Sequence, residues 1–430
     1  ASGIGLCRTE HMFLGERKQI IQTFILNDDD AVREKAVGEL FEAQTGDFYG
    51  MFKEMDGLPV IVRLLDPPLH EFLESPRALD VEIARLEATG GDKTLIAEKR
   101  MLMERIDGFA EQNPMLGLRG CRLGIVYPIL PEMQVRAIAT ATAKLKKEGL
   151  DPKPEIMIPL VSTVAELEKL RAVAEKIIAE VAAEEGVELD IEVGTMIELP
   201  RAAVTADEIA TQADFFSFGT NDLTQTTFGF SRDDVEAEFV PQYLQEHLLP
   251  YNPFATIDPG VAKLVEMGVK LGHEGNPDLV CGVCGEHGGD PDSIHTFNKI
   301  GLDYVSCSPY RVPVARLAAA QAALEEESHD HRFIIAGVGR FALGPFCAYN
   351  RKGNDATHEN RPAVRRRRRV RGQGNHRGGL GPLGARYEEL RLRHLKRRKL
   401  LSRPPGGDEP RNAGKLRRNR SSERERRPYL

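Results

Sequence analysis

The 430-residue sequence lacks any apolar segment that could cross a lipid bilayer, and no signal peptide is recognisable at its start. A spanning helix needs about 20 consecutive apolar residues, and the apolar runs here are shorter, so we expect neither membrane insertion nor secretion. Cysteine is also scarce, because the chain contains only six, at uneven spacing. This spacing provides no disulfide framework and fits a reducing compartment. The first residue is Ala1 rather than methionine, and we expect the natural N-terminus to lie upstream.

Positive charge is scarce over most of the chain and concentrated near its end. Residues 361–430 contain 24 Lys and Arg against 6 Asp and Glu, whereas residues 1–360 contain 34 against 59. Proteins bind nucleic acid largely by neutralising phosphates with Lys and Arg. We therefore expect the acidic body not to bind nucleic acid.

Residues 328–430 have the composition of a low-complexity tail. They are rich in Arg, Gly and Pro, and residues 365–369 are all arginine. Such a segment cannot bury enough apolar surface to order itself, so we expect a disordered basic tail. Only residues 387–401 have the pattern of a basic amphipathic helix. A solvated tail, or translation of a wrong frame or intron, is the favoured interpretation, and an RNA-binding or targeting arm is the alternative.

The first 327 residues contain short apolar segments that alternate with helical patterns. Eight such segments, mostly ending in a polar residue, have the length and composition of buried strands. They lie at residues 2–8, 59–66, 113–120, 155–161, 190–198, 215–222, 279–286 and 304–308, and the longest helical patterns at residues 75–113, 132–147, 164–184 and 312–326. Eight strands alternating with helices predict an α/β fold, a closed (β/α)8 TIM barrel over residues 1–327, with its active groups at the strand C-termini.

Two of the predicted strands end in carboxylates, Glu198 and Asp222. Adjacent parallel strands lie about 4.8 Å apart, so both acids could bind one divalent cation through hard oxygen ligands. The alternative is that each acid caps the helix that follows its strand. The equivalent positions of the two acids, and the Gly219-Thr-Asn221 stretch before the second, favour the metal site.

The other predicted strand ends carry three cations, an amide and a thiol. These are Arg8, Arg63, Arg119, Asn221 and Cys284. Guanidinium groups match phosphate and carboxylate bidentately, so this set of groups predicts a small phosphorylated carboxylate as substrate. Cys281 and Cys284 could also suggest zinc or a dithiol. However, no second pair stands at ligand spacing, and residues three apart in a strand point to opposite faces.

Six motifs, in this order, resemble the pyruvate/phosphoenolpyruvate barrel at the C-terminal end of the pyruvate, phosphate dikinase family. They are residues 5–13, 63–72, 113–124, 219–225, 284–290 and 306–313. Cys7-Arg-Thr-Glu-His11 and Cys284-Gly-Glu-His-Gly-Gly-Asp290 separate this family from the related phosphoenolpyruvate synthases and sugar-phosphotransferase enzyme I. The resemblance extends from residue 1 to about residue 324, and the tail matches nothing in the family.

The resemblance implies that a phosphoryl group moves between a phosphohistidine on a swivelling domain and the enolate of pyruvate. It implies Mg²⁺ as cofactor, a homodimer through the barrel, and a location in the cytoplasm, a plastid or another organelle. The nucleotide-binding and phosphohistidine domains that precede the barrel in this family are not in this sequence. Motif by motif, the implied roles are Mg²⁺ binding by Glu198 and Asp222, substrate binding by Arg8, Arg63, Arg119, Gly219, Thr220, Asn221 and Asp222, and acid/base catalysis by Cys284.

Three alternatives stay open. One is the barrel of a phosphoenolpyruvate synthase or of an enzyme I-like phosphotransferase. Another is a different Mg²⁺-dependent enzyme that forms the enolate of pyruvate, such as an aldolase or lyase, although three arginines exceed what a carboxylate alone needs. The last is a binding module or adaptor that acts through the basic tail.

Overall fold

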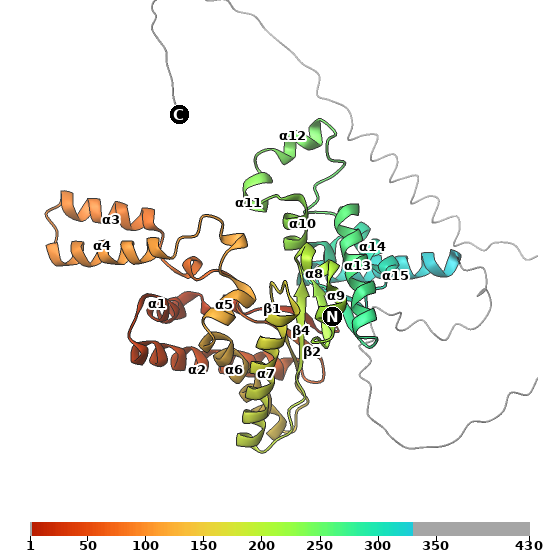
Figure 1. Ribbon diagram of the computed structural model, residues 1–430, viewed down its shortest axis with the longest axis horizontal. Coiled ribbons are helices and arrows are strands. Elements are labelled where there is room, and N and C mark those ends of the chain that lie inside the picture. Colours follow the sequence, from red (N-terminus) through yellow and green to blue (C-terminus); the bar gives the residue numbers. More distant parts are fainter. Residues whose placement is uncertain (1, 330–430) are drawn as a thin grey trace, which may run out of the picture. The chain divides into compact units, whose positions relative to one another are not determined.

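The computed structural model describes residues 2–329 as secondary structure and the side chains of residues 2–325. Its centre is one parallel sheet with the strand order β1-β2-β3-β4-β5-β6-β7 (Figure 1). The strands are β1 (Ile4–Arg8), β2 (Pro59–Arg63), β3 (Lys153–Ile158), β4 (Glu192–Ile197), β5 (Phe215–Phe218), β6 (Val280–Val283) and β7 (Tyr304–Val305). The predicted disordered tail and its helix at residues 387–401 lie outside the described residues, except that residues 328 and 329 end the last helix.

Fifteen α-helices connect and cover the strands within the described part of the chain. They are α1 (Lys18–Leu26), α2 (Asp30–Glu54), α3 (Pro76–Ala88), α4 (Lys93–Gly108), α5 (Gly120–Val126), α6 (Ile129–Lys147), α7 (Val164–Glu185), α8 (Pro200–Val204), α9 (Ala206–Ala210), α10 (Thr220–Phe228), α11 (Arg232–Val235), α12 (Val240–Gln245), α13 (Pro259–Gly275), α14 (Pro291–Ile300) and α15 (Val312–His329). The helical patterns expected from the sequence correspond to α3 with α4, α6, α7 and α15. None of the described helices is both long and apolar enough to span a membrane.

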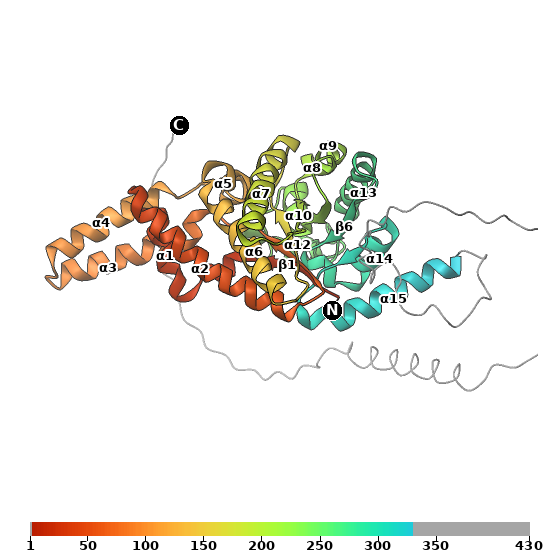
Figure 2. The ribbon, with the colours of Figure 1, turned by 90° about the horizontal axis from the view of Figure 1, so that it is seen from below.

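The ring of strands is nearly closed, as expected for an α/β barrel. The closing contact is between β1 and the residues after β7, because a Cβ added to Gly5 would come within 2.6 Å of Cβ of Ser306. Only a glycine in β1 allows this approach. Figures 1 and 2 show α6 and α7 outside the strands, and α3 and α4 as a helical hairpin that projects beyond them.

The sheet has seven strands, so the strand predicted at residues 113–120 is wrong. This segment forms a 3-10 helix (Pro114–Leu116) and then enters α5. Gly120 has a left-handed φ of 57° and donates its N–H to the carbonyl of Asp66 at 2.9 Å. Because β2 pairs directly with β3 over its whole length, no position remains for a strand between them. The segment instead lies across the loops that follow these two strands.

Side chains alternate between the inside and the outside of the barrel along each strand. The largest apolar core lies between the outer face of the strands and the helices. A smaller core fills the barrel interior and contains Ile61, Met157, Met196, Phe215 and Cys284, with Leu6, Val280 and Tyr304 partly buried beside them. Cys284 belongs to this inner set and Cys281 to the outer one.

The connection between α10 and α13 contains an additional segment, residues 230–257, which we call the β5–β6 excursion. It includes α11 and α12 and has a small core of its own. The ring centroids of Phe230 and Phe239 lie 5.1 Å apart in this core, and the Arg232 guanidinium lies over the ring of Phe254. The excursion begins two residues after α10, the helix that carries Asp222.

Candidate active site

The carboxyl ends of the strands bring the predicted site residues together at one end of the barrel. Arg8 of β1 is paired with Arg63 of β2 in the sheet register. Further round, Ile197 pairs with Phe218, and Phe218 pairs with Val283. The residues after these three are Glu198, Gly219 and Cys284, so all of these groups lie on the same rim of the barrel.

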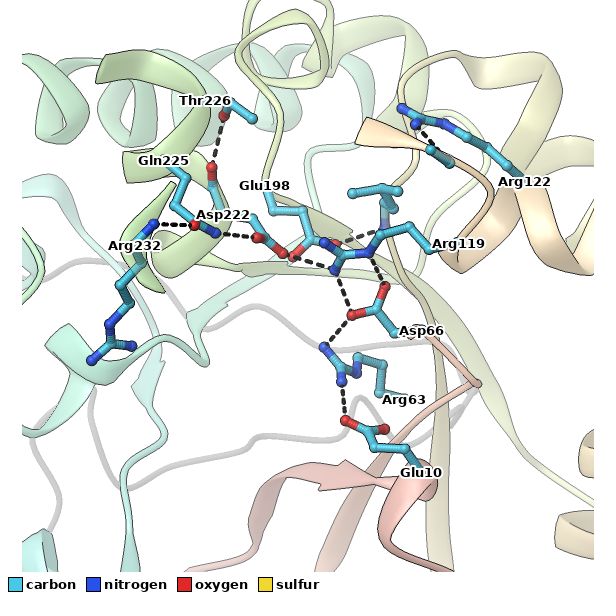
Figure 3. Close-up of polar contacts among 12 residues, drawn as sticks. Glu10, Arg63, Asp66, Arg119, Arg122, Glu198, Asp222, Gln225, Thr226 and Arg232 are labelled. Atoms are coloured by element: carbon cyan, nitrogen blue, oxygen red, sulfur yellow. Dashed lines mark hydrogen bonds and ion pairs between the residues drawn. The ribbon is translucent and has the colours of Figure 1, made fainter. Parts of the chain in front are cut away.

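Five charged side chains on this rim form a continuous ion-pair network (Figure 3). Arg63 contacts Glu10 through one Nη and Asp66 through the other, the latter at 2.9 Å. Arg119 donates from Nε and Nη2 to the two oxygens of Asp66, at 3.2 and 2.7 Å. The same Nη2 donates to Oδ2 of Asp222 at 3.0 Å. Arg119 therefore reaches the site from the loop before α5 and not from a strand.

Burial and charge compete strongly within this network. Burial by itself would raise the pKa of the Asp66 carboxyl, but Arg63 and Arg119 outweigh it and hold that pKa below its usual value. Burial likewise opposes the charge on both guanidinium groups, but the facing carboxylates raise their pKa values. All three groups are charged at neutral pH. Glu10 and Asp66 both lie inside the matched motifs, but the sequence pattern predicted no role for either.

Glu198 is almost fully buried, with 1% of its surface exposed. Its Oε1 accepts a hydrogen bond from the N–H of Leu160 at 2.7 Å. Leu160 has a φ of 60°, a strained conformation for a branched residue that turns its N–H toward the carboxylate. Burial, followed by the nearby charges of Asp222 and Asp66, raises the pKa of Glu198 well above its usual value, and the arginines only partly offset this.

Asp222 lies in the first turn of α10, with one donor on each oxygen. Gln225 Nε2 donates to Oδ1 at 2.8 Å, and Arg119 donates to Oδ2. The alternative that the two acids serve as helix caps is not realised. Leu199 and Gly219 are the N-cap residues of α8 and α10, and neither makes a side-chain capping bond. The two carboxylates point instead toward the network.

The pair of carboxylates fits a hard divalent cation. Among residues 2–325 no group of three or more His, Cys, Asp or Glu side chains could hold a metal ion, so a cation bound to these two acids would need further ligands of other kinds. Burial is the main cause of the raised pKa of Glu198, and repulsion from the negative charges of Asp222 and Asp66 adds to it. A bound cation would relieve that repulsion, and carboxylate oxygens are the ligands that Mg²⁺ prefers.

The Cys284 thiol follows β6 and is 7% exposed. Burial raises its pKa to about 12, although the Ser217 hydroxyl and the charges of Arg63 and Arg8 act in the opposite direction. Burial therefore outweighs the neighbouring cations, which by themselves would lower this pKa. The thiol is protonated at neutral pH.

Two polar residues that were not predicted from the sequence, Ser217 and Tyr304, lie beneath Cys284. Ser217, Gly282 and Tyr304 occupy the same level of three adjacent strands. A Cβ on Gly282 would come within 2.1 Å of the Tyr304 ring, so the glycine allows this ring to lie across β6. Burial raises the pKa of Tyr304 well above its usual value, and the Ser217 hydroxyl opposes this shift as it does for Cys284. Cys284, Ser217 and Tyr304 thus share the barrel interior.

Hydrogen bonds also fix the loop between β5 and α10. Asn221 Oδ1 accepts from the N–H of Glu286 at 2.9 Å. The Thr220 hydroxyl lies 2.8 Å from Nδ1 of His287, and Nε2 of His287 lies 2.8 Å from the Pro253 carbonyl. Burial lowers the pKa of His287, so the neutral ring donates from Nε2 and accepts at Nδ1. His287 is thus a buried residue with both ring nitrogens in hydrogen bonds.

The residues of this site lie within a span that matches a known protein family. Residues 1–324 match the family model described as PEP-utilising enzyme, PEP-binding domain. The chain belongs to this family. All of the rim residues described above lie within the matched span of the PEP-binding domain.

Curated relatives of this PEP-binding domain are named pyruvate, phosphate dikinase, which confirms the resemblance. The protein from Clostridium symbiosum is 49% identical over 330 residues, which are 76% of this chain and 37% of that protein. The chloroplastic enzyme 1 of Oryza sativa subsp. japonica is 51% identical over 331 residues (75% and 34%), and the Giardia intestinalis protein is 50% identical over 331 (76% and 36%). The chain thus spans about a third of the length of these relatives.

Among solved structures, a citrate lyase from Burkholderia xenovorans aligns with a TM-score of 0.30 and 16% identity. The alignment covers 46% of this chain and 60% of the lyase. A similarity this low supports no conclusion about the chain.

Proposed function

We propose that the barrel binds pyruvate and phosphoenolpyruvate together with Mg²⁺, as the pyruvate-side catalytic domain of a pyruvate, phosphate dikinase. The observation that carries the proposal is the rim itself, where the buried Glu198 and the partly buried Asp222 lie together with Arg63 and Arg119. A site with two carboxylates and two guanidinium groups suits an anionic substrate that binds together with a divalent cation. In the complete enzyme a phosphohistidine on another domain would exchange its phosphoryl group with the pyruvate enolate at this rim.

Glu198 and Asp222 would hold the Mg²⁺. The ion would supply positive charge next to the enolate oxygen of the substrate and so stabilise the enolate. Asp66 keeps the Arg119 guanidinium in place beside Asp222, since it binds two of its nitrogens. The two ligands are therefore held by bonds that exist before any substrate arrives, which reduces the reorganisation needed for binding.

Arg8, Arg63 and Asn221 would bind the phosphoryl group, and Arg119 would line the site. Nε of Arg63 is buried and lacks a hydrogen-bond acceptor within the described part of the chain. This leaves a charged donor for a substrate oxygen. Gly219 and Thr220 begin α10, whose first N–H groups have no partner inside the helix and so also suit an anion.

Cys284 would exchange the proton at the methylene carbon. With its pKa raised to about 12, the thiol carries its proton at neutral pH and is ready to donate to the enolate as pyruvate forms. In the opposite direction the thiolate would remove a methyl proton, and its high pKa would make it a strong base. The thiol lies 3.8 Å from the Phe218 carbonyl oxygen, a contact that would orient the sulfur.

The wider assignments rest on the relatives. Their shared name favours a dikinase over a phosphoenolpyruvate synthase, an enzyme I-like barrel, or an aldolase or lyase. A homodimer through the barrel is proposed from the family resemblance of the sequence alone. A cytoplasmic or plastid location is also proposed, and one of these relatives is named chloroplastic. The division into a barrel at residues 1–327 and a separate tail at 328–430 belongs to the same proposal.

Calorimetry with Mg²⁺ and oxalate, a mimic of the enolate, tests the proposal. We expect the wild-type chain to bind oxalate only when Mg²⁺ is present. Glu198→Gln or Asp222→Asn replaces an anionic oxygen with a neutral one, and each should reduce binding at least tenfold. Oxalate binding that is equally strong in both variants would show that this pair does not hold the metal.

A further inference from the structure

Gln225 stands one turn after Asp222 on α10 and bonds in two directions at once. Its Nε2 donates to Oδ1 of Asp222 at 2.8 Å, and its Oε1 accepts from the N–H of Arg232 at 2.8 Å. Arg232 is the first residue of α11, inside the β5–β6 excursion. One half-buried side chain therefore joins the Asp222 carboxylate to the excursion (Figure 3).

The Arg232 N–H decides which way the Gln225 amide faces. Only the amide oxygen can accept that hydrogen bond, so the NH2 group must point toward Asp222. Arg119 donates to the other oxygen of the same carboxylate at 3.0 Å. With a donor on each oxygen, the Asp222 carboxylate cannot rotate without breaking a hydrogen bond.

The excursion is itself held firmly around Arg232. Glu236 accepts from Nε of Arg232 at 3.0 Å and from Nδ2 of Asn252 at 2.9 Å. A second connection lies near the other end of the excursion, where Nε2 of His287 bonds to the Pro253 carbonyl. The backbone donor that orients Gln225 is thus part of a connected structure and not of a free loop.

We propose that Gln225 is a positioning residue that fixes the Asp222 carboxylate for cation binding and couples it to the β5–β6 excursion. The inference rests on the proposed function, in which Asp222 is a Mg²⁺ ligand. Hydrogen-bond partners of metal ligands typically change metal affinity by about 10- to 100-fold when they are removed. Gln225 makes its contribution through Asp222 and need not touch the cation.

The first test measures Mn²⁺ binding to the full 430-residue chain by the electron paramagnetic resonance of free Mn²⁺. Gln225→Met keeps the length of the side chain but removes its donor and its acceptor, and we expect the Kd to rise about tenfold. The matched control is Gln242→Met, because exposed Gln242 lies on α12 and makes its side-chain bond to Glu246 and not to Asp222. The control should bind as wild type does. A Gln225→Met chain with wild-type affinity would overturn the proposal.

The second test removes only the backbone donor. Arg232 is the first residue of α11, where proline is tolerated, and Ser231 before it already has φ −89° and ψ 116°, which suit a following proline. Arg232→Pro and Arg232→Ala both lose the side chain, but only Arg232→Pro loses the N–H. We expect Arg232→Pro to bind Mn²⁺ several-fold more weakly than Arg232→Ala, and equal affinities would contradict the coupling. This comparison also serves if Gln225→Met does not fold.

Glu198→Gln and Asp222→Asn, measured in the same assay, distinguish a failure of the proposed metal pair from a failure of the positioning role of Gln225. If both variants bind Mn²⁺ as wild type does, the metal pair is wrong and the role of Gln225 fails with it. If both lose affinity but Gln225→Met and Arg232→Pro do not, the proposed function stands and only the positioning role is refuted.

Discussion

Cys284 shows how burial and charge compete at a single residue. Its neighbours include Arg63 and Arg8, which favour the thiolate, and yet its pKa rises to about 12 because the sulfur is enclosed in the barrel interior. Burial raises the pKa of Cys281 for the same reason, on the outer face of the same strand. Both thiols are therefore buried. The proposed acid/base residue Cys284 differs from Cys281 because it lies at the barrel rim, where the other site residues gather.

We predict that Cys284→Ser retains Mg²⁺-dependent oxalate binding but loses exchange of the pyruvate methyl protons with deuterated water. The proposed Mg²⁺ ligands lie elsewhere, Glu198 after β4 and Asp222 in α10, so binding should survive, whereas a hydroxyl is a far weaker acid than a thiol. Proton NMR of pyruvate follows the exchange, which requires neither ATP nor a phosphohistidine. Exchange at the wild-type rate in the variant would remove Cys284 from the acid/base role.

Replacing glycine by alanine should have opposite effects at Gly219 and at Gly46. A Cβ on Gly219 would lie 2.4 Å from Oε2 of Glu198, so Gly219→Ala should displace that carboxylate and weaken Mg²⁺-dependent oxalate binding at least tenfold. Gly46 is exposed in the middle of α2 with nothing within 4 Å of a new Cβ. Gly46→Ala should leave binding unchanged and stabilise the fold by about 0.5–1 kcal/mol. Calorimetry and urea unfolding measure the two effects, and wild-type binding by Gly219→Ala would contradict the close approach.

At the scale of one element, α7 begins with a complete capping box. Thr163 accepts from the N–H of Glu166, and Glu166 accepts from the N–H of Thr163 and from the N–H and hydroxyl of Ser162. Partial burial alone would raise the pKa of Glu166, but these hydrogen bonds outweigh it and lower that pKa. Because the folded pKa is lower than the unfolded one, the carboxylate stabilises the fold above the unfolded pKa. That stabilisation is lost as the pH falls through the folded pKa.

Glu166→Gln should therefore destabilise the protein at pH 7 and have less effect at an acid pH below the lowered pKa of Glu166, where the wild-type carboxyl is itself neutral. The side chain is partly exposed, so solvent screening limits the loss at pH 7 to about 0.5 kcal/mol. Urea unfolding of both chains at the two pH values provides the measurement. A difference that is equally large at both values would mean that the charge of Glu166 is not the cause.

For the whole molecule, the proposed site lies entirely within residues 2–325, and the family match ends at residue 324. We predict that a chain ending at His329 binds oxalate and Mg²⁺ with the affinity of the full chain. RNA filter binding with the same two chains tests the alternative role of the basic tail. A large loss of oxalate affinity on truncation would show that the division at residue 327 is wrong.

The sequence by itself determined the order of seven strands and which of them deliver charged groups. A buried parallel strand is a local apolar run, and the residue after it falls on a common rim whatever the rest of the chain does. This is why the local pattern alone correctly places Arg8, Arg63, Glu198 and Cys284 at the same end of the barrel.

Only the tertiary structure decided the remaining features, because each depends on contacts that a local sequence pattern does not specify. The segment before Arg119 resembles a strand locally, but the direct pairing of β2 with β3 excludes it from the sheet. The pKa of Cys284 is set by enclosure in the barrel, and burial is a property of the assembled fold. Asp66 bonds to Arg119, 53 residues away, and Gln225 meets Arg232 only because the excursion folds back onto α10. Hydrogen-bond geometry and desolvation arise from three-dimensional packing, and neither can be inferred from a local sequence pattern.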